Sequence, residues 1–361
     1  MSESNPNRRA ARVRLLLLGI VFLAIIQFVV LLLIVPGRSS RTAPPKEQSI
    51  ATTTAPTERH AIRPGAVVAP PGAPPAVREP LQRVVKYGRG EGEVGLVHEP
   101  EQEPLGPESF AIGRDGEILV ADRVNQRIVV YSRDGIYLRS VSIPGIALGD
   151  VMADGAGRLY VYDQVRRALQ CYDADGKLQG GLNLNPKEID TRGYFHVVGD
   201  AVYFADAAAR DVLVAVIKDG ALTAPDNSTE HATEGVHGDS GRVYSFTVDK
   251  GQGIGMQIRE QGAAQVAGQA VQVALPGVVS ARFVGEDGQG RFYVQTERLE
   301  SNRIVLEVLS FSPAGQQLGV TRMPENDYFA WTTKLVDVRP DGAIVQFLPQ
   351  KEQAKLNLFT N

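Results

Sequence analysis

The sequence of 361 residues predicts an all-β fold, a six-bladed β-propeller, preceded by one transmembrane helix and a proline-rich linker. Three observations lead to this prediction. Residues 15–35 form an apolar run without a charge. Residues 36–80 hold ten of the 22 prolines. Residues 81–361 repeat one pattern of short apolar strands and glycine turns six times, and such a repeat of 40–50 residues is typical of propeller blades.

The apolar run reads "LLLLGIVFLAIIQFVVLLLIV", with Gln27 as its one strongly polar residue. About 20 such residues, rising about 1.5 Å each, cross the hydrocarbon core of a bilayer. A buried core helix and a cleaved signal peptide are the alternatives. A signal peptide usually has a shorter apolar region, and the following "VPGRSSRTA" offers no good cleavage site. We therefore expect residues 15–35 to be an uncleaved signal anchor.

Basic residues flank this anchor on both sides. The N-terminal tail, residues 1–14, carries four arginines, and Arg38, Arg41 and Lys46 follow the anchor. Positive charge before the first span favours a cytoplasmic N-terminus. We expect a single-pass protein of the cytoplasmic (plasma) membrane with its main domain on the extracytoplasmic side, in the periplasm or at the cell surface.

The linker, residues 36–80, has almost no aromatic residue and no apolar periodicity. Segments such as "PPGAPPAVREP" cannot build a core and lack backbone donors. Its 45 residues span about 40 Å as a flexible coil and about 140 Å as extended polyproline. The linker is therefore expected to be disordered and to hold the domain away from the membrane.

Residues 81–361 contain six units of strand, glycine turn, apolar strand ending in a polar loop, and two further strands. The first turn of each unit has a glycine at Gly116, Gly157, Gly199, Gly241, Gly290 and Gly342. A second turn follows about 20 residues later in five units, at Gly135, Gly176, Gly220, Gly262 and Gly315. The sixth unit lacks an outermost strand, and residues 82–87, "QRVVKY", are expected to supply it. This pairing closes the ring and removes an exposed sheet edge.

The first unit, "KYGRGEGEVGLVHEP…SFAIGRDGEILVADRVNQRIVVYSRDG", resembles an NHL repeat. The glycine-rich start, the strand "ILVAD", the Asn-x-Arg-Ile step and the final Asp-Gly carry the resemblance. It is fair in the second unit and weak in the other four. The resemblance implies a six-bladed scaffold that chiefly binds proteins and in some families RNA or small ligands. A minority of related propellers are metal-dependent hydrolases or lyases.

Acidic residues end the second strand of five units, at Asp122, Asp163, Asp206, Asp249 and Glu297. We interpret them as turn-forming residues that accept hydrogen bonds from the next loop, rather than as a catalytic ring. The loops after them share one face, which we call the arginine face. It carries Arg123, Arg127, Arg166, Arg167, Arg210, Arg298 and Arg303. These arginines either bind a partner's carboxylates or phosphates or pair with neighbouring acids.

The segment 326–334, "NDYFAWTTK", holds the only tryptophan, Trp331. Its three aromatic residues are expected to fill the wedge between two blades. The alternative is an exposed anchor for a binding partner.

Catalytic and metal-binding motifs are sparse. His196 and His237 fall in neighbouring innermost strands, and His98 lies before the first blade. Their spacing is not that of a zinc motif, so no metal site and no cofactor are predicted. No G-x-S-x-G motif is present, and the single cysteine, Cys171, fits a core strand.

The charge of residues 81–361 argues against nucleic acid as a partner, because they carry 28 Lys/Arg and 37 Asp/Glu. The sequence therefore favours a membrane-tethered scaffold that binds protein partners or a ligand in the cell envelope, within an assembly of several subunits, and has no catalytic activity. The alternatives are a metal-dependent lyase or hydrolase that uses the central channel, and a cytosolic RNA-binding protein.

Overall fold

A computed structural model describes residues 79–185, 189, 193–206, 208–226, 232–249, 252–261 and 268–360, with the backbone of Val67–Val68. The basic tail (1–14), the predicted anchor (15–35) and most of the linker (36–80) lie outside this part, as does the turn at Gly262. In the part that is described, no helix is long and apolar enough to cross a membrane.

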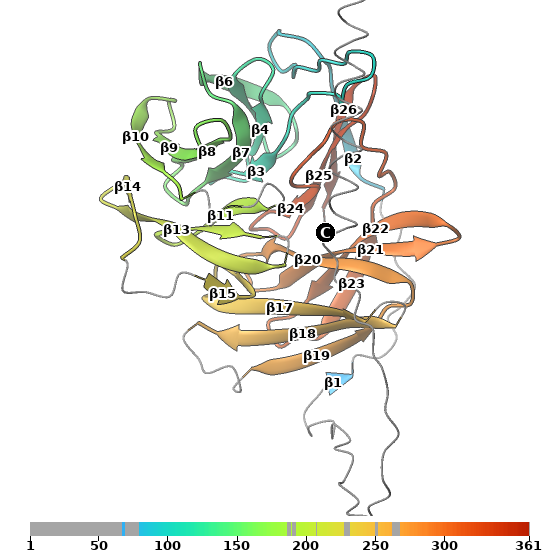
Figure 1. Cartoon of the computed structure of the whole chain (residues 1–361). Helices are drawn as coiled ribbons and strands as arrows, with labels where there is room; N and C mark the ends of the chain where they lie inside the picture. Colours follow the sequence, from blue (N-terminus) through green and yellow to red (C-terminus); the bar gives the residue numbers. More distant parts are fainter. Residues whose placement is uncertain are drawn as a thin grey trace, which may run out of the picture. The chain divides into compact units, whose positions relative to one another are not determined.

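The described strands form six antiparallel sheets, the blades, and each blade contacts the next, the sixth contacting the first (Figure 1). Each blade is described from its innermost strand outward. The first consists of β3 (Phe110–Ile112), β4 (Ile118–Asp122), β5 (Arg127–Tyr131) and β6 (Tyr137–Ser142), and the second of β7 (Leu148–Ala153), β8 (Leu159–Asp163), β9 (Ala168–Tyr172) and β10 (Leu178–Asn183). The third consists of β11 (Tyr194–Val198), β12 (Ala201–Ala205), β13 (Arg210–Lys218) and β14 (Ala221–Thr223). A short strand, β15 (Ala232–Glu234), also pairs with β13.

The fourth blade consists of β16 (Val236–His237), β17 (Arg242–Asp249), β18 (Gly253–Glu260) and β19 (Gln269–Ala274). The fifth consists of β20 (Val278–Glu286), β21 (Phe292–Glu300), β22 (Arg303–Phe311) and β23 (Gln317–Arg322). The sixth consists of β24 (Val336–Val338), β25 (Ile344–Pro349), β26 (Ala354–Phe359) and β2 (Leu81–Val85). A strand from the linker, β1 (Val67–Val68), pairs in parallel with β19 at the outer edge of the fourth blade. The prediction of an all-β, six-bladed propeller is confirmed.

The outermost strand of the sixth blade comes from the other end of the domain. β2 pairs antiparallel with β26, from Leu81 opposite Leu358 to Val85 opposite Ala354. Figure 1 shows β2, in blue, beside β26, in red. The sequence placed this strand at residues 82–87, and the structure begins it one residue earlier and ends it two residues earlier. The two ends of the domain are thus joined in one sheet.

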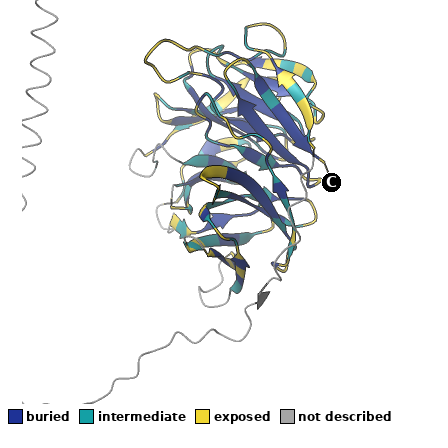
Figure 2. Ribbon diagram, turned by 90° about the vertical axis from the view of Figure 1, so that its right-hand side faces the viewer, coloured by how far each residue is buried: buried dark blue, intermediate teal, exposed yellow. Residues whose placement is uncertain are grey.

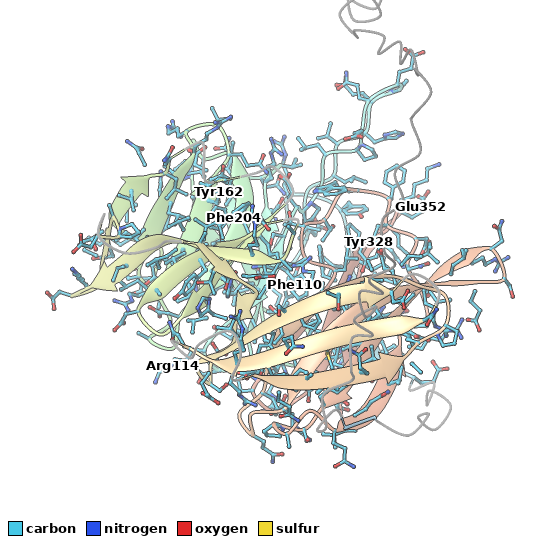
Figure 3. All side chains as sticks on the ribbon, turned by 60° about the horizontal axis from the view of Figure 1, so that its bottom comes forward. Phe110, Arg114, Tyr162, Phe204, Tyr328 and Glu352 are labelled. Atoms are coloured by element: carbon cyan, nitrogen blue, oxygen red, sulfur yellow. The ribbon has the colours of Figure 1, made fainter. Side chains whose placement is uncertain are left out.

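The core lies between neighbouring blades, where the β-branched and aromatic residues of the second and third strands meet. Phe110, Phe204 and Phe292 are almost fully buried, and Cys171 is a buried free thiol. Figure 2 shows buried strands in dark blue and exposed residues in yellow in the loops and on parts of the outer strands, and Figure 3 marks Phe110 and Phe204 among the packed side chains. The assignment of Cys171 to the core is therefore confirmed.

Each first turn has a glycine in the left-handed region because a turn of this type requires positive φ there; Gly157 and Gly290 have φ of 82° and 70°. In the second blade Asp154 caps the turn: it accepts hydrogen bonds from the amides of Ala156 and Arg158 and from the Tyr160 hydroxyl. The fifth blade repeats this cap with Asp287.

The fourth blade has Gly238 where the second has Asp154. Glu286, at the end of β20 in the next blade, takes the missing role by accepting hydrogen bonds from the Ser240 amide and the Tyr244 hydroxyl. The turns at Gly116, Gly157 and their equivalents share one face of the propeller with the second turns, because strand direction alternates along each blade. We call it the glycine face. The arginine face lies opposite.

Candidate functional site

Two cavities open into the centre of the ring. One, of about 660 Å³, lies toward the arginine face, and we call it the aromatic pocket. The other, of about 490 Å³, lies toward the glycine face, and we call it the channel cavity. Tyr194, Val236 and Phe283 line both cavities and so form the waist between them. Near this waist lie Arg282 in the aromatic pocket and the two histidines and Asp337 in the channel cavity.

The aromatic pocket is bounded on one side by the connection between the fifth and sixth blades. This segment is held by backbone hydrogen bonds from Phe329 to Pro349 and from Thr333 to Glu108, both of 2.8 Å. Tyr328 accepts a hydrogen bond of 3.1 Å from Gln346, and Phe329 packs edge-on against His98 at 5.1 Å. The connection is therefore fixed on both sides of its only tryptophan.

Trp331 is 65% exposed and lines the aromatic pocket. The expectation that all three aromatic residues of this segment fill the wedge between blades is thus wrong for Trp331. Tyr328 and Phe329 are half-buried, in keeping with that expectation. Trp331 differs because Ala330 and Thr332 on either side are buried, which turns the tryptophan outward.

Arg282 lies in the wall opposite, on the innermost strand β20. Its guanidinium carbon is 3.8 Å from the centre of the Tyr194 ring, and its Nη1 donates a 2.9 Å hydrogen bond to the Thr333 carbonyl. Burial raises the pKa of Tyr194 to about 12, although the charge of Arg282 acts against it. The Tyr194 ring therefore presents a neutral face to the guanidinium, a favourable cation–π arrangement.

The channel cavity contains the two histidines that the sequence placed in innermost strands. Asp211 bonds both: its Oδ1 is 2.9 Å from His196 Nε2, and its Oδ2 is 2.9 Å from His237 Nδ1. The ring of Tyr203 stacks on His237 at 4.3 Å. Burial by itself would raise the pKa of Asp211, but the charge of His196 and the hydrogen bonds from both histidines outweigh it and lower the pKa to about 2.

His98 packs against Phe329, away from the other two histidines. Among residues 79–360 as described, no three His, Cys, Asp or Glu side chains stand close enough together to hold a metal ion. The histidines of the channel cavity are instead neighbours of a structural carboxylate.

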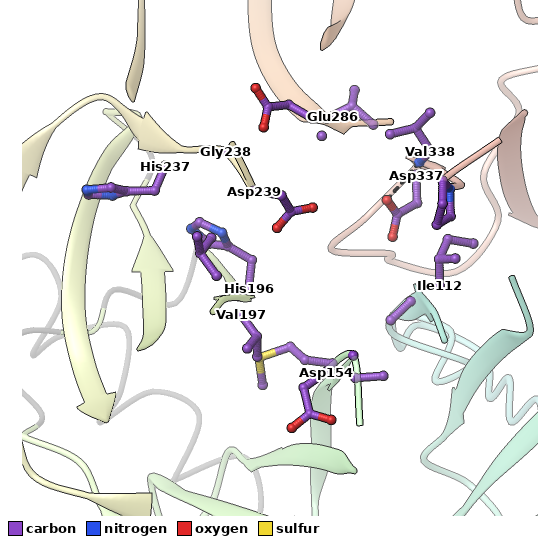
Figure 4. A pocket seen from close by; sticks show the side chains of 18 of the residues that line it. Ile112, Asp154, His196, Val197, His237, Gly238, Asp239, Glu286, Asp337 and Val338 are labelled. Carbon is purple, nitrogen blue, oxygen red and sulfur yellow. Dashed lines mark hydrogen bonds between the residues drawn. The ribbon is translucent and has the colours of Figure 1, made fainter. Parts of the chain in front are cut away.

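Four acids line the channel cavity, Asp154, Asp239, Glu286 and Asp337 (Figure 4), and burial shifts the pKa of two of them upward. Burial raises the pKa of Asp337 to about 6, against the attraction of Lys334 and Arg282. Burial also raises the pKa of Asp239, and the charge of Glu286 adds to the effect. Lys334 itself is held by Asp150, with Nζ and Oδ1 3.2 Å apart. The channel cavity therefore contains acids that take up protons more readily than exposed acids do.

The structure pairs five of the seven predicted arginines with acids of the same domain. The pairs are Arg123 with Glu108, Arg127 with Asp122, Arg166 with Asp163, Arg210 with Asp206 and Arg298 with Glu307. Arg167 and Arg303 are exposed, and neither side chain has an ion pair within the described part of the chain. The side chains of Arg166 and Arg210 still expose 58% of their surface. Most of these arginines therefore form ion pairs with acids of the same domain, which is one of the two alternatives that the sequence leaves open.

The Asn-x-Arg step of the first blade forms a clamp on the segment between β2 and β3. Asp122 is fully buried and accepts hydrogen bonds from the amide of Gly95 and from Asn125 and Arg127. Arg127 also donates to the carbonyls of Arg89, Gly90 and Glu93, and Asn125 donates to that of Gly88. These residues therefore hold the start of the propeller in place.

The other acidic residues at the ends of second strands differ from one another in their hydrogen bonds and exposure. Asp163 and Asp206 accept amide hydrogen bonds from their own loops, as predicted for turn-forming residues. Glu297 lines the aromatic pocket and accepts a 2.8 Å hydrogen bond from Ser280. Asp249 is exposed and adjoins residues outside the described part.

Sequence reasoning missed Arg282, Asp211 and Asp337. A signal for two of them was present: Arg282 and Asp337 are charged residues inside predicted innermost strands, and in a propeller such strands surround the central channel. The sequence could not supply the pairing of Asp211 with two histidines, which lie 15 and 26 residues away along the chain.

Comparison with known proteins identifies the repeat. Residues 105–131 match the family model of the NHL repeat. The first blade thus carries an NHL repeat within a six-bladed propeller. No curated protein matches the sequence.

Several solved structures show a distant likeness to the chain. A virginiamycin B lyase from Staphylococcus aureus is 11% identical, with a TM-score of 0.41, and the match covers 78% of this chain and 99% of that one. A member of the DUF4221 family from Bacteroides vulgatus is 11% identical, with a TM-score of 0.44 and coverage of 79% and 97%. The glutaminyl cyclase of Myxococcus xanthus is 11% identical, with a TM-score of 0.37 and coverage of 78% and 97%. Likenesses of this size carry no information on function.

Proposed function

We propose that this chain is a membrane-tethered β-propeller that binds a protein partner through its arginine face, as a scaffold in the cell envelope without catalytic activity of its own. The observation that carries the proposal is Trp331, 65% exposed at a pocket of about 660 Å³ on a rigid segment. Trp and Tyr are enriched among the residues that contribute most to binding, and they act best when they are pre-organised.

The charges of the arginine face support a protein partner rather than a nucleic acid. Five of its seven arginines are paired with acids of the same domain, so the face offers few free cations to a phosphate backbone. Paired arginines that stay exposed, such as Arg166 and Arg210, suit the rim of a protein interface, where charge sets orientation and association rate. Residues 81–361 also carry a surplus of nine acidic over basic residues, and such a domain is poorly suited to a phosphate backbone.

The location is part of the same proposal. The apolar run 15–35 anchors the chain in the cytoplasmic membrane, with the N-terminus inside and the propeller outside. The described residues include no group of three His, Cys, Asp or Glu side chains that could hold a metal ion. We therefore do not propose the metal-dependent lyase or hydrolase that is the alternative from the sequence.

Site-specific photo-crosslinking of the full-length protein in its native membrane tests the binding surface. A photoreactive phenylalanine at position 331 is expected to give a defined crosslinked protein, whereas the same group at Leu138, 50% exposed on the outer strand β6, gives none. Equal crosslinking from both positions, or none from 331, would contradict the proposed surface.

Protease treatment tests the orientation. Protease added outside the cytoplasmic membrane is expected to cleave between residues 36 and 80 and to release the domain. A domain that stays protected until that membrane is opened would reverse the orientation.

A further inference from the structure

The aromatic pocket contains an arginine, Arg282, that forms no ion pair with a described acid, although it attracts the more distant Asp337. Among the residues that the structure describes, no carboxylate oxygen lies within 4.0 Å of the Arg282 guanidinium. By contrast, Arg298 on the adjacent strand forms a two-point ion pair with Glu307, with distances of 2.9 and 3.2 Å. Among the described residues, Arg282 contacts the Thr333 carbonyl and the Tyr194 ring, and it attracts Asp337 from beyond ion-pair distance. A half-buried guanidinium without an ion pair suits a carboxylate of a binding partner, because its planar fork can bind both carboxylate oxygens.

The strand register sets the order of polar groups along the pocket wall. Gln295 lies opposite Arg282, and Glu297 lies opposite Ser280, two residues closer to the arginine face. Two residues of a strand correspond to about 6.6 Å. The Arg282 guanidinium and the Gln295 amide therefore lie deep in the pocket, and the Glu297 carboxylate, an acceptor, lies nearer its mouth. The carboxy-terminal end of a peptide has the matching order, with a carboxylate at its tip and backbone N–H donors behind it.

Part of the remaining wall is apolar and is formed by Trp331, Phe329, Ala281 and Leu335. Two further acids also line the pocket, Glu103 and Asp206, of which Asp206 is paired with Arg210. The exposed indole of Trp331 is the largest apolar surface there, and an apolar side chain placed on it would be removed from water. Tyr194, Val236 and Phe283 separate the pocket from the channel cavity, so a chain end fits this pocket better than a chain that must pass through.

We infer that the aromatic pocket binds the free carboxy terminus of a peptide whose last side chain is apolar. The terminal carboxylate pairs with Arg282, a backbone N–H behind it donates to Glu297, and the last side chain packs on Trp331. This inference rests on the proposed function, since it names the part of a protein partner that the arginine face receives.

The chain provides its own reporter for the test, because Trp331 is the only tryptophan in the 361 residues. The purified full-length protein is titrated with three acetylated Gly/Ser hexapeptides while the Trp331 fluorescence is followed. The first ends in leucine with a free carboxylate, the second is its amide, and the third is an amide with aspartate before the leucine. We expect saturable binding of the first peptide and at least about tenfold weaker binding of the other two, because a charge-assisted hydrogen bond is lost.

The Arg282→Gln variant is expected to bind the free acid at least about tenfold more weakly, whereas Lys177→Gln, at an exposed turn on the glycine face, binds it as the unaltered protein does. The comparison of acid and amide uses the unaltered protein, so it decides the question even if Arg282→Gln fails to fold. Equal binding of acid and amide, or preference for the internal aspartate, would overturn the inference. If crosslinking from position 331 succeeds while acid and amide bind equally, only this inference fails. If both experiments fail, the proposed function fails with it.

Discussion

Tyr244 in the fourth blade donates a hydrogen bond to Glu286 in the fifth blade. The second and fifth blades cap the equivalent turn with their own aspartates, Asp154 and Asp287, each bonded to the tyrosine of its own blade. The fourth blade has Gly238 at the position of that aspartate, so its cap comes from the next blade. Glu286 therefore joins two blades at a point where other blades are capped independently.

Replacing Glu286 with glutamine is expected to lower the free energy of unfolding by about 1 to 3 kcal/mol, because a buried acceptor of several hydrogen bonds is altered. The variant loses the ion pair with Arg242, at 3.1 Å, and keeps only one acceptor oxygen for the hydrogen bonds from Ser240 and Tyr244. Urea denaturation measures the effect. Glu352→Gln, at an exposed position, serves as the control and is expected to change stability by no more than about 0.5 kcal/mol. Equal effects of the two variants would show that the inter-blade cap contributes nothing.

Arg127→Gln is expected to lower stability by about 3 kcal/mol, since it leaves the fully buried Asp122 without its cationic partner. The change also removes the hydrogen bonds that hold the carbonyls of Arg89, Gly90 and Glu93. Arg303→Gln, which breaks no ion pair among the described residues, is the matched control. Thermal and urea unfolding of both variants check the difference, and a variant of Arg127 as stable as that of Arg303 would refute the clamp.

Removal of residues 1–80 is expected to leave a domain that unfolds cooperatively, whereas removal of residues 1–90 deletes β2 and exposes the edge of β26. The longer deletion also takes away Gly88, Arg89 and Gly90, whose carbonyls the clamp binds. We expect the longer deletion to aggregate or to melt at a much lower temperature in scanning calorimetry. Identical melting temperatures would rule out ring closure as a source of stability.

Asp337 is expected to make stability depend on pH between about 7 and 4. Its pKa is raised to about 6 in the folded protein, so the folded state takes up a proton before the unfolded state does. This group therefore adds stability as the pH falls through 6 and adds no more below its unfolded pKa of about 3.9. Asp337→Asn should be more stable than the unaltered protein at pH 8, and the difference should shrink toward pH 4.5 in urea titrations. A constant difference across this range would contradict the raised pKa.

The blades could be predicted from the sequence because each repeats the same local requirements. A glycine such as Gly157 is needed wherever the turn has positive φ, and the strands after it must be apolar on both faces because blades pack on both sides. Asp163 and Arg166 could likewise be predicted as a pair, since they lie three residues apart at one turn. These features depend on residues that are close along the chain.

The cavities could not be predicted in the same way. Arg282 meets Tyr194 from a blade 88 residues earlier in the chain, and Asp211 joins histidines of two different blades. Periodicity shows that blades follow one another, but it does not show which side chains turn toward the common axis. The exposure of Trp331 was misjudged because the connection before the sixth blade follows no repeat, so no other blade indicated its geometry.

The order in which β1 and β2 join the propeller also has a mechanical consequence. A pulling force applied to the chain before Val67 reaches β1 first, and this strand is attached to β19 by only two residue pairs. Once β1 has detached, the force passes to β2, which is attached to β26 by five pairs. The domain thus has a weak outer attachment that yields under small loads and a stronger inner one whose rupture opens the ring. A force on the chain before Val67 is thus expected to detach β1 from the edge of the fourth blade before it separates β2 from β26 and opens the ring.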